Sequence, residues 1–318
     1  MGQQSRGEDA LHAFFKSSFA HTKGLTGPGD DCAQLQPRQE EILHWTCDQL
    51  VEGVHVSAGT DPEIQARKLL RRTLSDLAAA GATPWAVTWT IALPPDRGSS
   101  WIQRLAAAFV AEAEVFEVAV IGGDLSTSGP TAVTSPGLGG VLTCTALGRS
   151  SLPAPGRAGA MPGDSLAVTG KLGGAVQSGR HLLPEPRLAQ GRRLVSHYQA
   201  SAMMDLSDGM ARDLPRLLAA SGVAAEVDLE KLPLHELGGG SSQSHWLAAL
   251  GDGEDYELLV CLPQDMDSAA QDSIFDGVGL TQIGRILPGN GVKWLDQGKN
   301  TDLKVDGWEH AWSAGADA

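Results

Sequence analysis

The chain of 318 residues contains few cysteines and few basic residues. Its four cysteines, Cys32, Cys47, Cys144 and Cys261, are far apart and show neither the spacing of a disulfide framework nor that of a zinc site. We therefore expect a reducing, cytoplasmic environment. Lysine and arginine number 24 against 38 aspartate and glutamate, a formal net charge of −14. This balance argues against a nucleic-acid partner, because nucleic-acid-binding domains normally carry a basic surface.

Long apolar segments are also absent. No uninterrupted apolar run approaches the roughly 18 residues that cross a bilayer, and the first residues, MGQQSRGEDALHAFF, contain no apolar core of a signal peptide. We therefore expect no membrane partner. The phosphate-binding motif GxxxxGK[ST], the zinc motif HExxH and the nucleophile motif GxSxG are all missing. The function must rest on other residues.

Length and composition predict a folded protein of two α/β domains. A chain of this length exceeds one typical core, and 42% hydrophobic residues are typical of a globular protein. The segment 150–164, SSLPAPGRAGAMPGD, is rich in proline, glycine and serine and is the best candidate for the boundary between the domains. We therefore predict domains at 1–149 and 150–318.

Alternating strand and helix patterns support a mixed α/β architecture. Helices are predicted over 9–20, 62–82, 100–116, 187–198 and 207–222. Strands are predicted over 42–53, 85–94, 118–125, 134–148, 165–170, 202–206, 224–230, 256–263 and 281–286. We expect the segment 118–125 to turn at its two glycines.

Acidic residues gather at strand ends and turns, beside small residues that let the backbone approach a ligand. The clusters contain Asp30 and Asp31, Asp48, Asp76, Asp124, Asp205 and Asp208 around Ser207, and Glu254 and Asp255. Each cluster alone is better explained by structure, as a helix cap or a solvated residue, than as a ligand. Together, without matching histidine or cysteine, they favour Mg²⁺, and several Mg²⁺ ions are typical of phosphoryl transfer. We place Asp213 on a solvated helix face instead.

Seven segments, in this order, resemble thiamine-monophosphate kinases, and they run from about residue 25 to 288. They are GPGDDCAQL, TCDQLVEGVHV, KLLRRTLSDLAAAGATP, VIGGDLSTSGP, MMDLSDGMARDL, GDGEDYELLVCLP and IGRI. That family belongs to a superfamily of ATP-binding enzymes with aminoimidazole-ribonucleotide synthetase, selenophosphate synthetase and a hydrogenase-maturation protein. VEGVHV and GEDYELL favour the thiamine kinase over these relatives.

The resemblance implies that ATP phosphorylates thiamine monophosphate to thiamine diphosphate. It implies a homodimer in which the N-terminal domains, which bind ATP and metal, join their sheets into a barrel, while the C-terminal domains complete the active site. The implied metal ligands are Asp31, Thr46, Cys47, Asp48, Asp76, Asp124, Asp205 and Asp208. The implied ATP contacts are Gly123, Asp124, Arg149 and Ser207, and the implied substrate contacts are His55, Glu254 and Trp308.

The expected chemistry needs no general base. A phosphate monoester has a second pKa near 6, so the acceptor is largely dianionic at neutral pH and is already a nucleophile. Its main obstacle is repulsion from the γ-phosphate of ATP, which Mg²⁺ held by aspartates relieves. We therefore expect direct in-line transfer without a phosphoenzyme.

The sequence departs from the family pattern at several positions. Cys47 stands where threonine is usual, Leu125 replaces a threonine, and Asp252 interrupts a double glycine. The glycine-rich KLGGAVQSGR also matches only loosely. Two alternatives stay open: a superfamily enzyme with another small acceptor, and a nucleotide or metal sensor without turnover.

Overall fold

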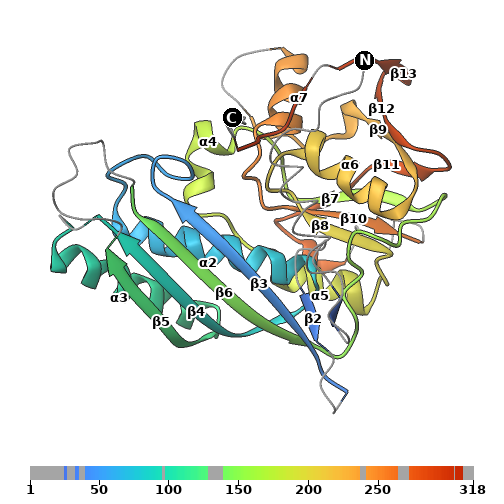
Figure 1. Cartoon of the computed structure of the whole chain (residues 1–318). Coiled ribbons are helices and arrows are strands. Elements are labelled where there is room, and N and C mark those ends of the chain that lie inside the picture. The colour runs from blue at the N-terminus through green and yellow to red at the C-terminus, as the bar shows by residue number, and fades with distance from the viewer. Residues whose placement is uncertain are drawn as a thin grey trace, which may run out of the picture.

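The computed structural model describes residues 25–26, 33–35, 40–94, 97–127, 139–236, 241–263, 272–303 and 305–310. These residues form two mixed sheets, each accompanied by helices (Figure 1). The predicted two-domain α/β fold class is thereby confirmed. The predicted helix over 9–20 and the acidic pair Asp30 and Asp31 lie outside the described residues.

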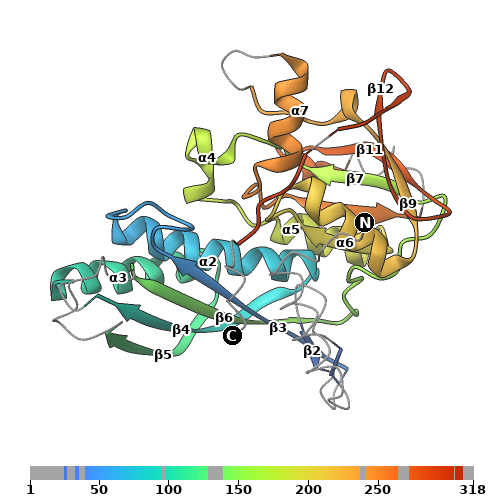
Figure 2. The same ribbon diagram turned by 45° about the horizontal axis from the view of Figure 1, so that its top comes forward.

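The first sheet has six strands in the order β1-β2-β3-β6-β4-β5. They are β1 (Leu25–Thr26), β2 (Ala33–Leu35), β3 (Ile42–Val51), β4 (Thr83–Leu93), β5 (Ala119–Thr127) and β6 (Val141–Ser150). All neighbours are antiparallel except β4 and β5. Helices α2 (Pro62–Ala79) and α3 (Ser99–Val115) cover the same face of this sheet (Figure 2). Their buried residues, such as Leu70 and Phe109, form the core of this half.

The second sheet has seven strands in the order β13-β12-β9-β11-β7-β10-β8. They are β7 (Ser165–Thr169), β8 (Ala202–Asp205), β9 (Ala224–Asp228), β10 (Leu258–Leu262), β11 (Leu280–Leu287), β12 (Gly291–Asp296) and β13 (Lys299–Thr301). The helices of this half are α4 (Ala175–Ser178), α5 (Leu188–Ser196), α6 (Met210–Ser221) and α7 (Ser242–Gly251). Short 3₁₀ turns are η1 (Arg180–Leu182), η2 (Leu229–Lys231) and η3 (Ser273–Phe275). Apolar side chains of α6 and α7 fill the main core of this half.

Helix α2 joins the two halves. It lies between the first sheet and the second domain (Figure 2), and its buried Ala78 and Ala79 pack with Met203, Leu258 and other residues of the second half. Gly191 of α5 permits this close packing, because a Cβ atom there would lie 2.0 Å from the carbonyl oxygen of Ala78. Side chains of α2 are therefore held between the two sheets.

Most predicted elements are present, with informative differences. Strand β5 continues through Gly122 and Gly123 instead of turning there, because both glycines pair with β4. The predicted boundary follows the end of β6, and the division of the chain there stays a prediction. Helix α7 and strands β12 and β13 were not predicted. Within the described ranges, no helix is both long and apolar enough to cross a bilayer.

Candidate functional site

One face of α2 carries a row of charged side chains, Lys68, Arg72 and Asp76, one helical turn apart. The side chain of Lys68 is completely buried, and that of Arg72 is 12% exposed. Charged groups are seldom buried this deeply without a specific partner. Their partners come from both domains, and together they define the candidate site.

Strand β3 supplies the first partners. The Thr46 hydroxyl donates to the Asp76 carboxylate, and Oδ1 of Asp48 lies 3.4 Å from Nη2 of Arg72. Thr46 and Asp48 share a face because side chains alternate along a strand. Cys47 therefore points to the opposite face, where its Sγ lies 3.4 Å from Oγ1 of Thr145. The predicted metal role would therefore fall to the backbone carbonyl of Cys47 and not to its thiol.

Strand β8 brings a second carboxylate to α2. Asp205, at the end of β8, is buried and accepts a hydrogen bond of 2.6 Å from the Ser75 hydroxyl. Ser75 precedes Asp76, so the helix links carboxylates from both domains. The chain then turns through Ser207 and Asp208 before α6 begins.

The prediction that Asp213 lies on a solvated face is wrong. Its side chain is fully buried, and its Oδ2 accepts the backbone N–H groups of Ser207 and Asp208 at 3.1 and 3.0 Å. Arg216 bonds both Asp208, at 2.5 Å, and Asp213, at 3.1 Å. Burial, followed by the charge of Asp208, raises the pKa of Asp213. Asp213 thus holds the turn that carries two predicted site residues.

The loop before β10 (Leu258–Leu262) contributes Glu254. Its carboxylate bonds the buried ammonium of Lys68, which also donates to the carbonyl of His55 at 2.6 Å. Glu254 has a left-handed backbone, with φ of 60°, and its N–H donates to the carbonyl of Ser207 at 2.8 Å. Burial lowers the pKa of Lys68, while Glu254 acts in the opposite direction. This pair connects the first domain to the second.

His55 lies beside two aromatic side chains from a distant segment of the chain, Trp308 and His310. Its ring centroid is 6.1 Å from that of Trp308 and 5.7 Å from that of His310. Burial, and then the charges of Arg72 and Lys68, lowers the pKa of His55 to about 3. The ring is neutral at pH 7, and because Nδ1 accepts the N–H of Val51 at 2.9 Å, its proton is on Nε2.

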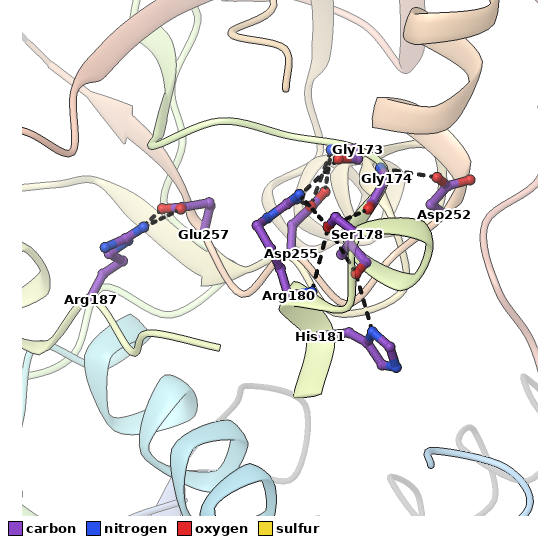
Figure 3. A network of polar contacts seen from close by, with 10 residues as sticks. Gly173, Gly174, Ser178, Arg180, His181, Arg187, Asp252, Asp255 and Glu257 are labelled. Carbon is purple, nitrogen blue, oxygen red and sulfur yellow. Dashed lines mark hydrogen bonds and ion pairs between the residues drawn. The ribbon is translucent and has the colours of Figure 1, made fainter. Parts of the chain in front are cut away.

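The glycine-rich turn after β7 is fastened to the same loop as Glu254 (Figure 3). Asp255 accepts the N–H of Gly173 at 3.0 Å and lies 3.1 Å from Nη2 of Arg180. Asp252 accepts the N–H of Gly174 at 3.1 Å. Burial raises the pKa of Asp255 to about 7. The unusual Asp252 therefore fills a role, as it pins the turn whose sequence matched the family only loosely.

Three predicted nucleotide contacts lie elsewhere. Gly123 and Asp124 belong to β5, at the edge of the sheet as far as the structure describes it, and Arg149 is the penultimate residue of β6. The register between neighbouring strands leads from Asp48 through β6 and β4 to Gly123, so Asp48 and Gly123 face the same side of the sheet. Because side chains alternate along a strand, Asp124 points to the opposite face from Asp48. Arg149 stacks over Trp85 at 5.5 Å and lines a separate cavity of about 620 Å³.

The structure therefore divides the predicted residues into three groups. Those at the junction are Thr46, Asp48, His55, Asp76, Asp205, Ser207, Asp208, Glu254 and Trp308. Gly123, Asp124, Arg149 and the side chain of Cys47 lie apart from them. Asp31 lies outside the described residues.

The donors fit the chemistry of Mg²⁺, because the junction offers carboxylate and hydroxyl oxygens. Among the residues that the structure describes, no three His, Cys, Asp or Glu side chains gather closely enough to hold a metal. Mg²⁺ commonly uses one or two carboxylates and completes its shell with water and substrate phosphates. Pairs such as Asp48 and Asp76 fit this mode of binding.

Sequence reasoning missed Lys68, Arg72 and Ser75. The spacing of four residues from Lys68 to Arg72 to Asp76 was a usable signal, since it places all three on one helix face. Nothing in the local sequence indicates that this face is buried against a second domain.

The chain matches two family descriptions. Residues 29–149 match AIR synthase related protein, N-terminal domain, and residues 156–295 match AIR synthase related protein, C-terminal domain. A curated relative from Rhodopirellula baltica, named thiamine-monophosphate kinase, is 34% identical over 298 residues, which cover 87% of this chain and 90% of the relative.

Solved structures agree over nearly the whole chain. One described as AaThiL complexed with AMPPCP and TMP has a TM-score of 0.79 and 28% identity, and the match covers 98% of this chain and 99% of that one. Thiamine-monophosphate kinase from Stenotrophomonas maltophilia K279a has a TM-score of 0.70 and 33% identity, with 94% and 99% covered.

Proposed function

Since the chain belongs to the thiamine-monophosphate kinase family, we propose that it transfers the γ-phosphoryl group of ATP to thiamine monophosphate, giving thiamine diphosphate. The observation that carries the proposal is the full-length likeness to AaThiL, whose structure holds TMP and AMPPCP. The junction between the two domains, where α2 meets β3, β8 and the Glu254 loop, is the proposed active site.

The proposed chemistry is in-line attack by the acceptor phosphate, without a phosphoenzyme. Mg²⁺ bound by Asp48, Asp76, Asp205 and Asp208 would neutralise phosphate charge. Neutral His55 would offer its Nε2–H as a donor to the substrate, and Trp308, which is 39% exposed, would offer an aromatic face for the thiamine ring. The Lys68 ammonium fixes Glu254, the other proposed substrate contact.

We propose further that the active enzyme is a homodimer and that each site takes Asp124 from the second copy. Within one chain, three strand spacings and the thickness of the sheet separate Asp48 from Asp124, so they cannot share one ion. Among the described strands, β5 lies at the edge of its sheet, and its Ile121 and Leu125 are 65% and 52% exposed. Exposed apolar edges are typical of surfaces that pair with another chain. A barrel formed by the two six-stranded sheets would cover this edge.

The N-terminal half, to residue 149, is then the proposed ATP-binding, metal-binding and dimerising domain, and the half from 150 completes the site. Gly123, Arg149 and Ser207 are proposed nucleotide contacts. The position of Arg149 beside its own cavity fits a contact with the outer part of a nucleotide bound at a dimer interface.

Incubation with Mg²⁺, ATP and thiamine monophosphate tests the activity directly. Thiamine diphosphate is the expected product. ATP consumption only with another acceptor would favour a different superfamily activity, and ATP binding without turnover would favour a sensor. Protein labelled by [γ-³²P]ATP alone would refute direct transfer.

Mixed dimers test the shared site. Asp48→Asn and Asp124→Asn chains are each expected to be inactive. A statistical mixture, in which half of the dimers are mixed and each mixed dimer has one intact site, should regain about a quarter of wild-type activity. No recovery in dimers shown to have exchanged chains would contradict a shared site.

A further inference from the structure

Arg72 is the least satisfied charged residue of the junction. It lies mid-way along α2, between Lys68 and Asp76, and its side chain is 12% exposed. Its Nε and Nη1 are buried and have no hydrogen-bond partner among the described residues. Buried N–H groups normally find a partner, because leaving one unpaired costs about 1–3 kcal/mol. Hydrogen bonding therefore does not explain the presence of an arginine here.

The charges around Arg72 do explain it. Its Nη2 lies 3.4 Å from Oδ1 of Asp48, which is longer than a close arginine–carboxylate contact. Burial alone would lower the pKa of Arg72, but Tyr256, Asp48, Glu254 and Asp76 together raise it. Lys68, by comparison, has Glu254 and a carbonyl as direct partners. Arg72 is a cation placed among carboxylates, and its described ion pair, at 3.4 Å, is with Asp48.

We propose that Arg72 is a resident cation of the carboxylate site, which occupies Asp48 and opposes the binding of a divalent metal there. This inference rests on the proposed function, because it concerns the same metal-binding carboxylates. The guanidinium neutralises part of the charge that Asp48, Asp76 and Glu254 concentrate between the domains. A second cation entering this space is repelled by Arg72 and must compete with it for Asp48.

The consequence is an order of binding. Without nucleotide, the metal meets a site that already contains a positive charge. With nucleotide, phosphate oxygens supply both ligands and negative charge, so the balance shifts toward the metal. Arg72 thus favours entry of the metal together with the nucleotide, and it tunes the affinity of the site instead of contacting the reacting atoms.

Metal binding by variants tests the inference without turnover. Mn²⁺ binding to the full chain is measured by titration with electron paramagnetic resonance, in the absence of ATP and thiamine monophosphate. Arg72→Met removes the charge and keeps most of the side-chain volume. We expect it to bind Mn²⁺ at least about tenfold more tightly than the wild type. Arg72→Lys restores a cation and should return the affinity to within about threefold of the wild type.

Arg67→Met is the matched control, since Arg67 lies on the same helix, is 45% exposed and faces Glu112 at 3.5 Å. It should leave Mn²⁺ binding unchanged. Unchanged or weaker binding by Arg72→Met, or an equal gain in Arg67→Met, would overturn the inference. A negative kinase assay does not affect this test, because the binding measurement uses no substrate.

If Arg72→Met fails to fold, wild-type protein labelled with ¹⁵N-arginine provides the test. The buried Nε–H of Arg72, assigned from its absence in Arg72→Lys, should shift when Mg²⁺ is added. Its remaining fixed while Mg²⁺ saturates the site would refute competition for Asp48.

Discussion

The ion pair between Lys68 and Glu254 should couple the two domains energetically. The residues are 186 positions apart in sequence, and the Lys68 side chain is 0% exposed while that of Glu254 is 19% exposed. The ammonium has one further partner, the carbonyl of His55 at 2.6 Å.

The structure sets the expected size of the effect. Removing one partner of a buried ion pair costs about 3–5 kcal/mol, because the other charge is left unpaired. Glu254→Gln leaves Lys68 buried, so we expect a loss in this range. Lys68→Met leaves a carboxylate that partly reaches water, so about 2–3 kcal/mol is expected. The double variant leaves neither charge, and the coupling energy should be about 2 kcal/mol or more.

Urea unfolding of the four proteins, followed by tryptophan fluorescence, measures this coupling. The matched control is the surface pair Arg104 and Glu63, whose Nε–Oε1 distance is 2.6 Å at 53% and 33% exposure. Its coupling should stay below about 1 kcal/mol. A coupling between Lys68 and Glu254 no larger than this control would refute the reasoning.

Three further predictions concern single side chains. Asp213→Ala should lower the free energy of unfolding in urea by about 3 kcal/mol and abolish turnover. Asp213→Asn keeps an acceptor for both backbone N–H groups and should lose less stability. Equal losses of stability in the two variants would contradict the role of Asp213 in the turn. Burial raises the pKa of Asp255 to about 7 in the folded protein. Between about pH 4 and 7 the folded state therefore binds a proton that the unfolded state has lost. The free energy of unfolding consequently falls as the pH rises through that window. Asp255→Asn should remove this decline in urea unfolding at about pH 5 and about pH 8, and an unchanged decline would exclude Asp255 as its source. Cys47→Thr should keep the turnover rate and the Mg²⁺ dependence within about twofold of the wild type, because the side chain lies on the sheet face opposite Asp48. A large change in either quantity would show that this side chain reaches the site.

The sequence was most informative where one local pattern decides the structure. The alternation in β3 predicts the strand, and the apolar spacing of α2 predicts the helix, because both depend on burial of a single face. Small residues around Asp205 and Asp208 correctly indicated a turn between β8 and α6. These elements follow from residues that are neighbours in the chain.

Local patterns failed where the outcome depends on distant segments. Asp213 resembles a solvated helical aspartate in sequence, yet it is buried because the preceding turn directs two backbone N–H groups at it. The face to which Asp124 points depends on register through β6 and β4, which no motif encodes. Arg72 and Lys68 resemble ordinary helix cations until a second domain covers them.

Helix α2 explains why the site and the domain arrangement belong together. Its apolar end, at Ala78 and Ala79, is packed against the second sheet, and Gly191 allows α5 to approach it without a side chain between them. The same rigid helix carries Ser75 toward Asp205 and Asp76 toward Thr46. A displacement of α2 therefore moves carboxylate partners from both domains at once. Because a phosphoryl-transfer site depends on positioning more than on any single base, the packing of this helix is as much a part of the site as the charged row that the helix carries.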